Sequence, residues 1–425
     1  MLLKIYRVIT ILGTPIISIY LYYRRFIGKE DKNRHDERIG ISKIPKPNGF
    51  LFWVHAASIG ESLSVISLIE NLLKNCPNSY LMITTGTITS AKILKDRLPD
   101  RAFHQYVPVD KPSYVSRFIE HWRPDVALWT ESEFWPNVIF ATHKAEIPLL
   151  LLNGRISDKS YAKWQIAPSL MKDILNCFNV CFGQSEEDVL RLKKLGAPKA
   201  KNLGNLKFSV PPLPVDAQCL DELQSQIRNR PLWLAASTHY LEEDMITNIH
   251  RKLKNIHKDI LTIIVPRQVN RGEKISRLLE NKNIPYALRS RNNPITPSTQ
   301  IYIADTMGEL GLFFSLSDIV FMGKSLVPHG GQNPLEPLKL GCAVVHGPHM
   351  TNFRWICEEM KKCGCSIEVR TILECSESIS QLINKISERK KMIQKGNKFI
   401  DSQSEVVSLV TGEILTTLDS KYGPT

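Results

Sequence analysis

The sequence predicts an α/β protein made of two doubly wound parallel sheets. Short apolar runs alternate along the chain with segments of helical periodicity, and small or polar residues follow each run. The alternation stops at residues 211–214 (Pro-Pro-Leu-Pro) and resumes at Leu232, which indicates a boundary between two domains. A chain of 425 residues is long enough for two domains of about 200 residues each.

The apolar runs place the expected strands. A first domain (28–210) has strands at residues 51–54, 80–84, 126–129 and 149–152. After a linker (211–230), a second domain (231–425) has strands at residues 233–236, 261–265, 301–304, 318–322 and 342–346. The charged, amphipathic tail from Ser376 predicts C-terminal helices that complete the second domain. Ligands of such a fold are expected at the carboxyl ends of its strands.

The stretch 329–353 is the densest of the strand-to-helix connections in Gly, His, Asn and Pro. Gly330 and Gly331 allow the backbone to approach a ligand closely, and Pro334 suits the first position of a helix. Glu336 then falls in the first helical turn, where a carboxylate can hold ribose hydroxyls while backbone amides meet a phosphate. The simpler interpretation is that Glu336 only complements the helix dipole.

The N-terminal segment 6–23 is apolar and aromatic, and its 18 residues are at the short end of a membrane-spanning helix. The charged residues 29–38 follow it without a small-residue cleavage site, which favours an uncleaved anchor over residues 1–27. Pro15 and nearby tyrosines leave a helix lying in the membrane interface as the alternative. Lys and Arg are denser after the segment than before it, which predicts a cytoplasmic body.

The amino-acid composition limits which kinds of partner the protein is expected to bind. The chain has 55 Lys and Arg against 42 Asp and Glu, a formal net charge of +13. This excess favours an anionic partner, whether nucleic acid, a phospholipid surface or a phosphorylated substrate, unless it reflects the background of its proteome. Nine cysteines, an odd number, argue against a disulfide framework. Cys357, Cys363 and Cys365 cluster without a paired C-x2-C or H-x3-H pattern, so no metal site is expected there.

Two doubly wound domains that face each other across a cleft are the plan of the GT-B glycosyltransferases. Dehydrogenases and periplasmic binding proteins also have two α/β domains. No G-x-G-x-x-G follows the first expected strand, which weakens a dinucleotide-binding interpretation, and no P-loop lysine motif is present.

Four stretches, taken in order, resemble the bacterial 3-deoxy-D-manno-octulosonate (Kdo) transferases. They are residues 55–61 (His-Ala-Ala-Ser-Ile-Gly-Glu), 131–137 (Glu-Ser-Glu-Phe-Trp-Pro-Asn), 305–310 (Asp-Thr-Met-Gly-Glu-Leu) and 330–353. The resemblance covers nearly the whole chain, and Gln332 departs from the histidine of many relatives. These relatives are GT-B enzymes that move Kdo from CMP-Kdo to a lipid A precursor.

The resemblance implies roles for matching residues. Glu61 is expected to be the general base, and Glu131 and Lys207 are expected to stabilise the transition state. The residues expected to bind CMP are Pro266, Arg267, Met307, Gly308, Glu309, Asn333, Pro334, Leu335 and Glu336.

The resemblance also implies an inverting reaction of lipopolysaccharide core biosynthesis, with no metal and no cofactor besides the donor substrate. The implied partners are CMP-Kdo, a tetraacyl lipid A precursor (lipid IVA) and inner-membrane phospholipids, with no nucleic acid. The implied location is the cytoplasmic side of the bacterial inner membrane.

Elementary chemistry is consistent with these roles. A carboxylate can take the proton of an acceptor hydroxyl without a metal. Glu61 is expected to open a helix whose dipole lowers its pKa, so that it is a weak base suited to a late deprotonation. Lys207 can balance a phosphate or the Kdo carboxylate, and Arg267, at the end of a strand, suits a bidentate phosphate contact. The plain alternatives are that Glu61 is only an acid of the first helical turn, that Glu131 and Glu133 cap the helix near Pro136, and that Lys207 is a solvated surface residue.

Two other functions remain open from the residues. One is a membrane-associated GT-B enzyme that uses a UDP- or ADP-sugar, which would lack selectivity for cytidine. The other is a non-enzymatic binder of anionic surfaces, which would show salt-sensitive binding of polyanions and no effect of Glu61→Ala.

Overall fold

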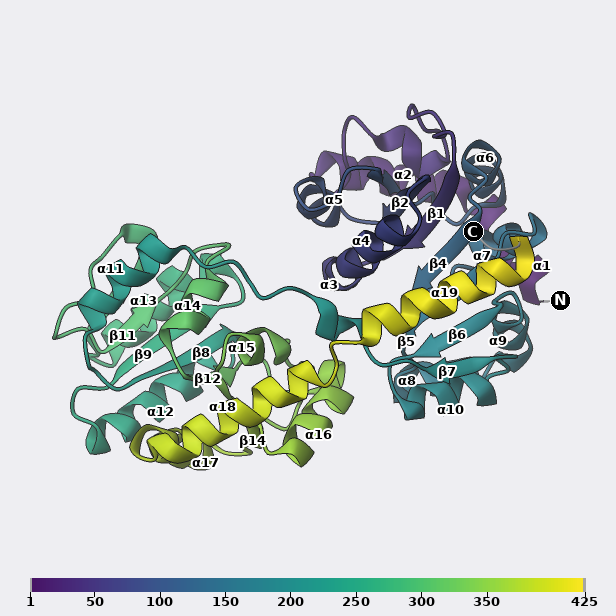
Figure 1. The fold of residues 1–425 in the computed structure, drawn as a ribbon. Helices are drawn as coiled ribbons and strands as arrows, with labels where there is room; N and C mark the ends of the chain where they lie inside the picture. Colours follow the sequence, from purple (N-terminus) through teal and green to yellow (C-terminus); the bar gives the residue numbers. More distant parts are fainter. Residues whose placement is uncertain (1, 423–425) are drawn as a thin grey trace. The chain divides into compact units, whose positions relative to one another are not determined.

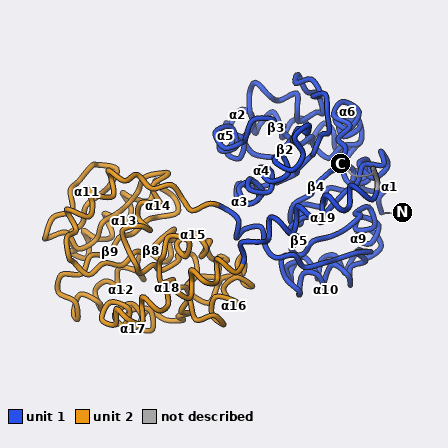
Figure 2. Tube along the Cα trace, in the orientation of Figure 1, with its two compact units in different colours: residues 1–210, 403–425 blue, residues 211–402 orange. Residues whose placement is uncertain are grey.

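The computed structural model describes residues 2–422 and divides into two compact units (Figure 2). Unit 1 contains residues 1–210 and 403–425, and unit 2 contains residues 211–402. Each unit is built on one seven-stranded parallel sheet, so the predicted pair of α/β domains is confirmed.

The sheet of unit 1 has the strand order β3-β2-β1-β4-β5-β6-β7 (Figure 1). The four strands expected from the sequence are β1, β2, β4 and β5, and the remaining three were not predicted. The strands are β1 (Phe50–His55), β2 (Ser79–Thr85), β3 (Ala102–Tyr106), β4 (Val126–Thr130), β5 (Leu149–Gly154), β6 (Val180–Gly183) and β7 (Ala200–Asn202).

The helices of unit 1 begin at recognisable sequence signals. Ser58, Thr87 and Ser185 are N-caps whose side chains accept a backbone hydrogen bond, and Pro112 and Pro136 occupy first helical positions. The helices are α1 (Leu2–Leu12), α2 (Thr14–Phe26), α3 (Ile59–Ser64), α4 (Ile66–Asn75), α5 (Ile88–Lys95), α6 (Pro112–Trp122), α7 (Pro136–Lys144), α8 (Asp158–Trp164), α9 (Pro168–Leu175), α10 (Glu186–Lys194) and α19 (Val406–Tyr422), with the 3-10 turns η1 (His35–Ile39) and η2 (Leu206–Ser209).

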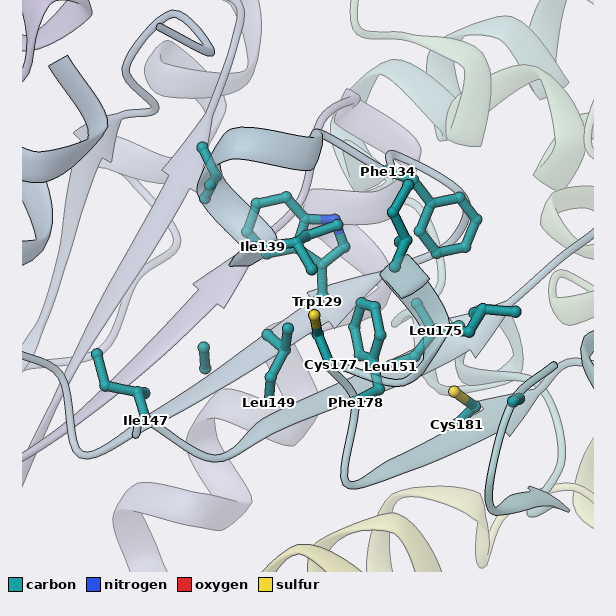
Figure 3. Close-up of a cluster of buried hydrophobic side chains, with 14 of the residues drawn as sticks. Trp129, Phe134, Ile139, Ile147, Leu149, Leu151, Leu175, Cys177, Phe178 and Cys181 are labelled. Carbon is teal, nitrogen blue, oxygen red and sulfur yellow. The ribbon is translucent and has the colours of Figure 1, made fainter. Parts of the chain in front are cut away.

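Alternate residues of each strand fill two separate cores, one on each face of the first sheet. In β1, Trp53 packs into one core, and Phe52 and Val54 pack into the other. Figure 3 shows part of the first core, where Trp129 of β4 and Leu149 of β5 meet side chains of the neighbouring helices. A sheet covered on both faces leaves its strand ends as the places where polar groups can gather.

The C-terminal helix α19 belongs to unit 1, although the predicted boundaries placed it in the second domain. It packs on α4 and η2 and contributes Val406, Val410, Ile414 and Leu418 to the second core (Figure 1). This spacing puts the four side chains on one face of the helix, which covers apolar side chains of the first sheet. The predicted boundary at residue 210 rests on the proline-rich break, which does not reveal that the chain later returns.

The sheet of unit 2 has the order β10-β11-β9-β8-β12-β13-β14. All five strands expected in this domain are present, and the short edge strands β10 and β14 were not predicted. The strands are β8 (Leu232–Thr238), β9 (Leu261–Pro266), β10 (Tyr286–Leu288), β11 (Ile301–Ile303), β12 (Ile319–Met322), β13 (Ala343–His346) and β14 (Ser366–Glu368).

The helices of unit 2 follow these strands. The segment predicted as a linker contains α11, which buries Leu223 and Ile227 in this unit. The helices are α11 (Ala217–Ile227), α12 (Glu243–Ile256), α13 (Gly272–Asn281), α14 (Leu310–Leu316), α15 (Leu335–Lys339), α16 (Arg354–Cys363), α17 (Ile372–Asn384) and α18 (Ile386–Asp401), with the 3-10 turns η3 (Val269–Arg271), η4 (Arg289–Arg291) and η5 (Thr351–Phe353).

The N-terminal segment forms the helices α1 and α2, which meet at an angle of 58°. No single helix among residues 2–422 is both long and apolar enough to cross a membrane, whereas this bent pair satisfies length and composition together. The predicted anchor stays a prediction. The helices also contact the unit: the Tyr6 hydroxyl donates to Asp110 Oδ2 at 2.9 Å, and the Asn137 amide donates to Thr10 Oγ1 at 3.3 Å.

The charged segment after α2, residues 29–38, is folded against the first sheet. Arg34 donates two hydrogen bonds to Glu37, and Glu37 accepts the backbone N–H of Tyr106 in β3 at 2.7 Å. Arg34 also donates to the backbone carbonyl of His104 in β3 at 2.7 Å, so partners distant in sequence hold this charged segment on the sheet.

Candidate active site

Glu61 lies in the first turn of α3, directly after the carboxyl end of β1. Its Oε2 accepts the Ala57 N–H at 2.9 Å and the Thr130 hydroxyl at 3.1 Å, and its Oε1 accepts the Ser58 hydroxyl at 2.7 Å. Ser58 in turn caps the helix by accepting the Glu61 N–H. The carboxylate is therefore fixed by three donors and is only 8% exposed.

The environment of Glu61 corrects the expectation drawn from the helix dipole. Burial raises the pKa of Glu61, the negative charge of Glu131 raises it further, and the three hydrogen bonds oppose the rise only in part. A six-residue helix has a weak dipole, and the loss of water around a buried carboxylate outweighs it. The structure thus makes Glu61 a stronger base than an ordinary glutamate.

Glu131 follows β4, the strand that neighbours β1, and its Oε1 forms an ion pair with Lys207 Nζ at 2.7 Å. Both side chains are largely withdrawn from water, with 17% of Glu131 and 16% of Lys207 exposed. Glu131 also has a φ of 53°, a left-handed backbone that is uncommon outside glycine and is found preferentially at functional sites. Glu61 and Glu131 therefore follow two adjacent strands, and Lys207 of η2 joins them through its ion pair with Glu131.

A network of amides holds Lys207 and Glu131 in place. Asn205 caps η2 by accepting the Lys207 N–H at 3.0 Å, and its amide donates to Gln184 Oε1 at 3.3 Å. Gln184 donates to Glu131 Oε1 at 3.3 Å and to the carbonyl of Asn153 at 3.0 Å. Gln184 and Asn205 were not predicted to belong to the site. Gln184 comes just after the apolar run of residues 180–183, a signal that could have marked it, whereas Asn205 follows no apolar run.

In unit 2, the residues expected to bind CMP lie at the carboxyl ends of strands. Pro266 ends β9 and Arg267 follows it, with an exposed side chain. Glu336 lies in the first turn of α15, as predicted, and accepts the Asn333 amide at 3.2 Å. Burial raises the pKa of Glu336, and the positive charge of Arg267 lowers it in part, so the structure brings these two residues within electrostatic reach.

The remaining residues of this set lie at the start of α15 and in the segment after β11. Pro334 directly precedes the first residue of α15, and Leu335 is buried. In the segment after β11, Met307 is 76% exposed and Gly308 has a φ of 87°. Glu309 forms an ion pair with Arg289 at 2.6 Å, which lowers the pKa of Glu309. The carboxylate of Glu309 is thus already neutralised within the protein.

Gly330 and Gly331 have φ angles of 90° and 73°, which explains why glycine occupies both positions. A side chain at Gly330 would collide with Asn352, and one at Gly331 would collide with Met350. The close approach expected of a ligand is therefore made, at these two Cα atoms, by other parts of the same chain.

Glu242 is a residue that the sequence analysis missed. It is fully buried after β8, and its carboxylate accepts backbone N–H groups from Lys324, Ser325, Leu326 and His239. These bonds tie the loop after β12 to the loop after β8. The rings of His239 and His329 also stack between these loops, with centroids 4.3 Å apart.

Two seven-stranded parallel sheets with polar residues at their strand ends give the chain a two-domain α/β fold of the GT-B type. A solved glycosyltransferase from Rickettsia africae is similar in fold, with a TM-score of 0.61 at 13% identity over 88% of this chain and 99% of the other.

Relatives and a family model narrow the class. Residues 33–210 match the family model of 3-deoxy-D-manno-octulosonic-acid transferase (kdotransferase). The chain is 32% identical to the 3-deoxy-D-manno-octulosonic acid transferase of Rickettsia bellii, over 96% of this chain and 99% of the relative. It is 31% identical to the enzyme of the same name from Haemophilus influenzae, over 92% and 93%. The chain belongs to the Kdo transferase family and is a glycosyltransferase that transfers Kdo in lipopolysaccharide biosynthesis.

Proposed function

We propose that the protein transfers Kdo from CMP-Kdo to an acylated and phosphorylated lipid A precursor of the tetraacyl type (lipid IVA), with Glu61 as general base. The observation that supports this proposal best is the arrangement of Glu61 beside the Glu131–Lys207 ion pair. Burial and Glu131 raise the pKa of Glu61, and three fixed donors orient its carboxylate. A base needs both a raised pKa and a fixed direction.

In the proposed reaction, an acceptor hydroxyl oxygen bonds to the anomeric carbon of Kdo as the bond from that carbon to the CMP phosphate oxygen breaks. The hydroxyl proton passes to Glu61, and the bonding electrons leave with CMP. Attack opposite the leaving group inverts the anomeric carbon. Lys207, supported by Glu131, balances negative charge that develops at the phosphate or stays on the Kdo carboxylate. No step requires a metal.

Unit 2 is the proposed donor-binding part. Arg267 is exposed at the end of β9, and a guanidinium there can contact the CMP phosphate through two hydrogen bonds. Glu336 accepts a hydrogen bond from Asn333, and an acceptor carboxylate of this kind suits the ribose hydroxyls. The remaining residues of the proposed donor site lie near the carboxyl ends of strands of this unit. They are Pro266, Pro334, Leu335 and residues 307–309.

The proposed location is the cytoplasmic face of a bacterial inner membrane. The helices α1 and α2 expose many large apolar side chains, among them Ile9, Leu12, Ile16 and Phe26. A net charge of +13 favours contact with anionic phospholipids and with the phosphates of the acceptor.

The test is mass spectrometry of a tetraacyl lipid A precursor incubated with the detergent-solubilised full chain and freshly prepared CMP-Kdo. Glu61→Gln removes the base while keeping the size of the side chain. Glu70→Gln, an exposed acid of α4, is the matched control. We expect one or more Kdo additions with the wild type and the control, and a rate lower by about 10²- to 10⁴-fold with Glu61→Gln.

Two outcomes would contradict the proposal. Kdo addition at the wild-type rate by Glu61→Gln would exclude this residue as the base. No addition by a folded wild-type protein, together with transfer from a UDP- or ADP-sugar, would exclude the proposed donor and acceptor pair.

A further inference from the structure

Unit 1 contains a cavity of about 440 Å³. The proposed catalytic residues Glu61, Glu131 and Lys207 are not among the residues that line it. This volume is in the range of roughly 300–1,000 Å³ found for ligand pockets. Its lining comes from helix α2, from Glu30 and Arg38 in the segment after α2, from the end of β1 and the loop that follows it, and from the segments after β2, β3 and β4. The cavity therefore joins the N-terminal helix to the loop that carries Glu61.

Helix α2 forms one wall of the cavity. Ile17, Tyr20 and Leu21 line it, and Leu21 is the buried residue of this helix. The helix is fastened at its C-terminal end, where Arg24 Nε donates to Glu30 Oε1 at 2.8 Å. This wall is apolar, and Val107 and Val109 continue the apolar lining on the other side.

The wall formed by the loop after β1 lies beside the proposed base. His55 and Ala57 line the cavity, and the Ala57 N–H is one of the three donors that hold Glu61. His55 is 1% exposed, and its Nε2 has no hydrogen-bond partner within the described part of the chain. An unpartnered polar atom in a nearly closed wall is a feature that a ligand would satisfy.

The positive charge of the cavity is concentrated on Arg24 and Arg38. Glu30 is shared by two arginines, Arg24 at 2.8 Å and Arg38 at 3.5 Å, so this group carries one more positive than negative charge. Two further acids, Asp110 and Glu133, also line the cavity, so its lining holds three acids against two arginines. The Asp110 carboxylate accepts the Tyr6 hydroxyl and two backbone N–H groups of α7. Burial raises the pKa of both acids, which favours their neutral forms.

We propose that this cavity binds the lipid acceptor, with one acyl chain against Ile17, Leu21 and Val109 and a phosphate of the acceptor sugar against Arg24 and Arg38. This inference rests on the proposed function and extends it: the N-terminal helix is a part of the acceptor site and not only a tether. The opposite face of α2 exposes Ile16 and Ile19, which suits contact with a lipid layer from which the acceptor is drawn.

The apolar part of the proposal is tested by filling the cavity from α2. Ile17→Trp places an indole in the lining, whereas Ile16→Trp places the same group on the exposed neighbour and is the matched control. With the full chain in detergent, we expect Ile17→Trp to raise the KM for a tetraacyl acceptor by at least about tenfold while kcat at saturation and the Kd for CMP stay unchanged. Ile16→Trp is expected to behave as the wild type. An equal KM for the two variants would overturn the proposal.

The charged part is tested with Arg24→Gln against Arg25→Gln. Both changes remove one positive charge from the end of α2, but only Arg24 lines the cavity. We expect Arg24→Gln to raise the KM for a phosphorylated acceptor and to leave the KM for its dephosphorylated form unchanged. A rise of the same size with both acceptors, or with both variants, would show that Arg24 does not contact a phosphate.

A bilayer phospholipid has the same chemistry as the acceptor, and vesicles of phosphatidylglycerol distinguish the two sources. If a phospholipid occupies the cavity, Ile17→Trp weakens vesicle binding relative to Ile16→Trp and leaves the acceptor KM unchanged, which overturns the proposal. Failure of the proposed function is a separate result, because the wild type itself would then add no Kdo.

Discussion

Lys207 and Glu131 form an ion pair at 2.7 Å, although one lies in η2 and the other follows β4. The pair is mostly shielded from water, so removing one partner leaves the other as an uncompensated charge. The negative charge of Glu131 also acts on Glu61 and raises its pKa. One contact therefore connects the proposed cation and the proposed base.

A double-mutant cycle on Lys207→Met and Glu131→Gln measures this coupling. Each single change is expected to lower kcat, because each leaves one member of the pair without its partner. The double variant should lose less than the sum of the two losses, with a coupling energy of roughly 0.5–3 kcal/mol. Additive losses in kcat would mean that the two side chains act independently.

The pH dependence of kcat reports on Glu61. Activity requires the ionised carboxylate, so the raised pKa of Glu61 places the acidic limb of the profile above the ordinary range of a glutamate. Glu131→Gln removes a negative charge that raises this pKa, so the acidic limb should move to lower pH. Glu70→Gln serves as the control and should leave the limb in place. A shift to higher pH would contradict the assignment of this limb to Glu61.

Arg267 is expected to hold the phosphate of CMP. Because charge-assisted hydrogen bonds contribute about 1.5–3 kcal/mol, Arg267→Ala should weaken CMP binding by roughly 10- to 100-fold. Calorimetric titration with CMP and with cytidine separates the phosphate from the nucleoside, and the affinity for cytidine should be unchanged. Arg277→Ala removes an exposed arginine of α13 and provides the comparison. Equal losses for CMP and cytidine would place Arg267 away from the phosphate.

Ile414 tests whether α19 is an integral part of unit 1. It is fully buried in the core beneath the first sheet, whereas Leu409 of the same helix is 51% exposed. Ile414→Ala should lower the free energy of unfolding by about 2–5 kcal/mol because it leaves a cavity, while Leu409→Ala should have a small effect. Urea denaturation followed by the fluorescence of the buried tryptophans measures both variants. Similar effects at the two positions would contradict this packing.

The sequence was sufficient for the α/β class, for the central strands of both sheets and for the loops that carry the proposed site. Apolar runs such as residues 149–152 and 261–265 are long and uninterrupted, so they identify buried strands without tertiary information. The strands that were missed, β3, β7, β10 and β14 at the sheet edges and β6 beside β7, have three to five residues each. An edge strand contacts fewer neighbours and therefore needs a weaker apolar pattern, which local periodicity does not detect.

The sequence by itself determined that Glu61, Glu131 and Arg267 follow strands, because strand ends can be recognised from residues adjacent in the chain. Only the tertiary structure decided that Lys207 pairs with Glu131, that α19 returns to unit 1, and that α2 lines a cavity beside Glu61. It also reversed the expected direction of the pKa of Glu61. Burial and charge pairing arise from residues distant in sequence, and their effect on a carboxylate exceeds that of a short helix on which it lies.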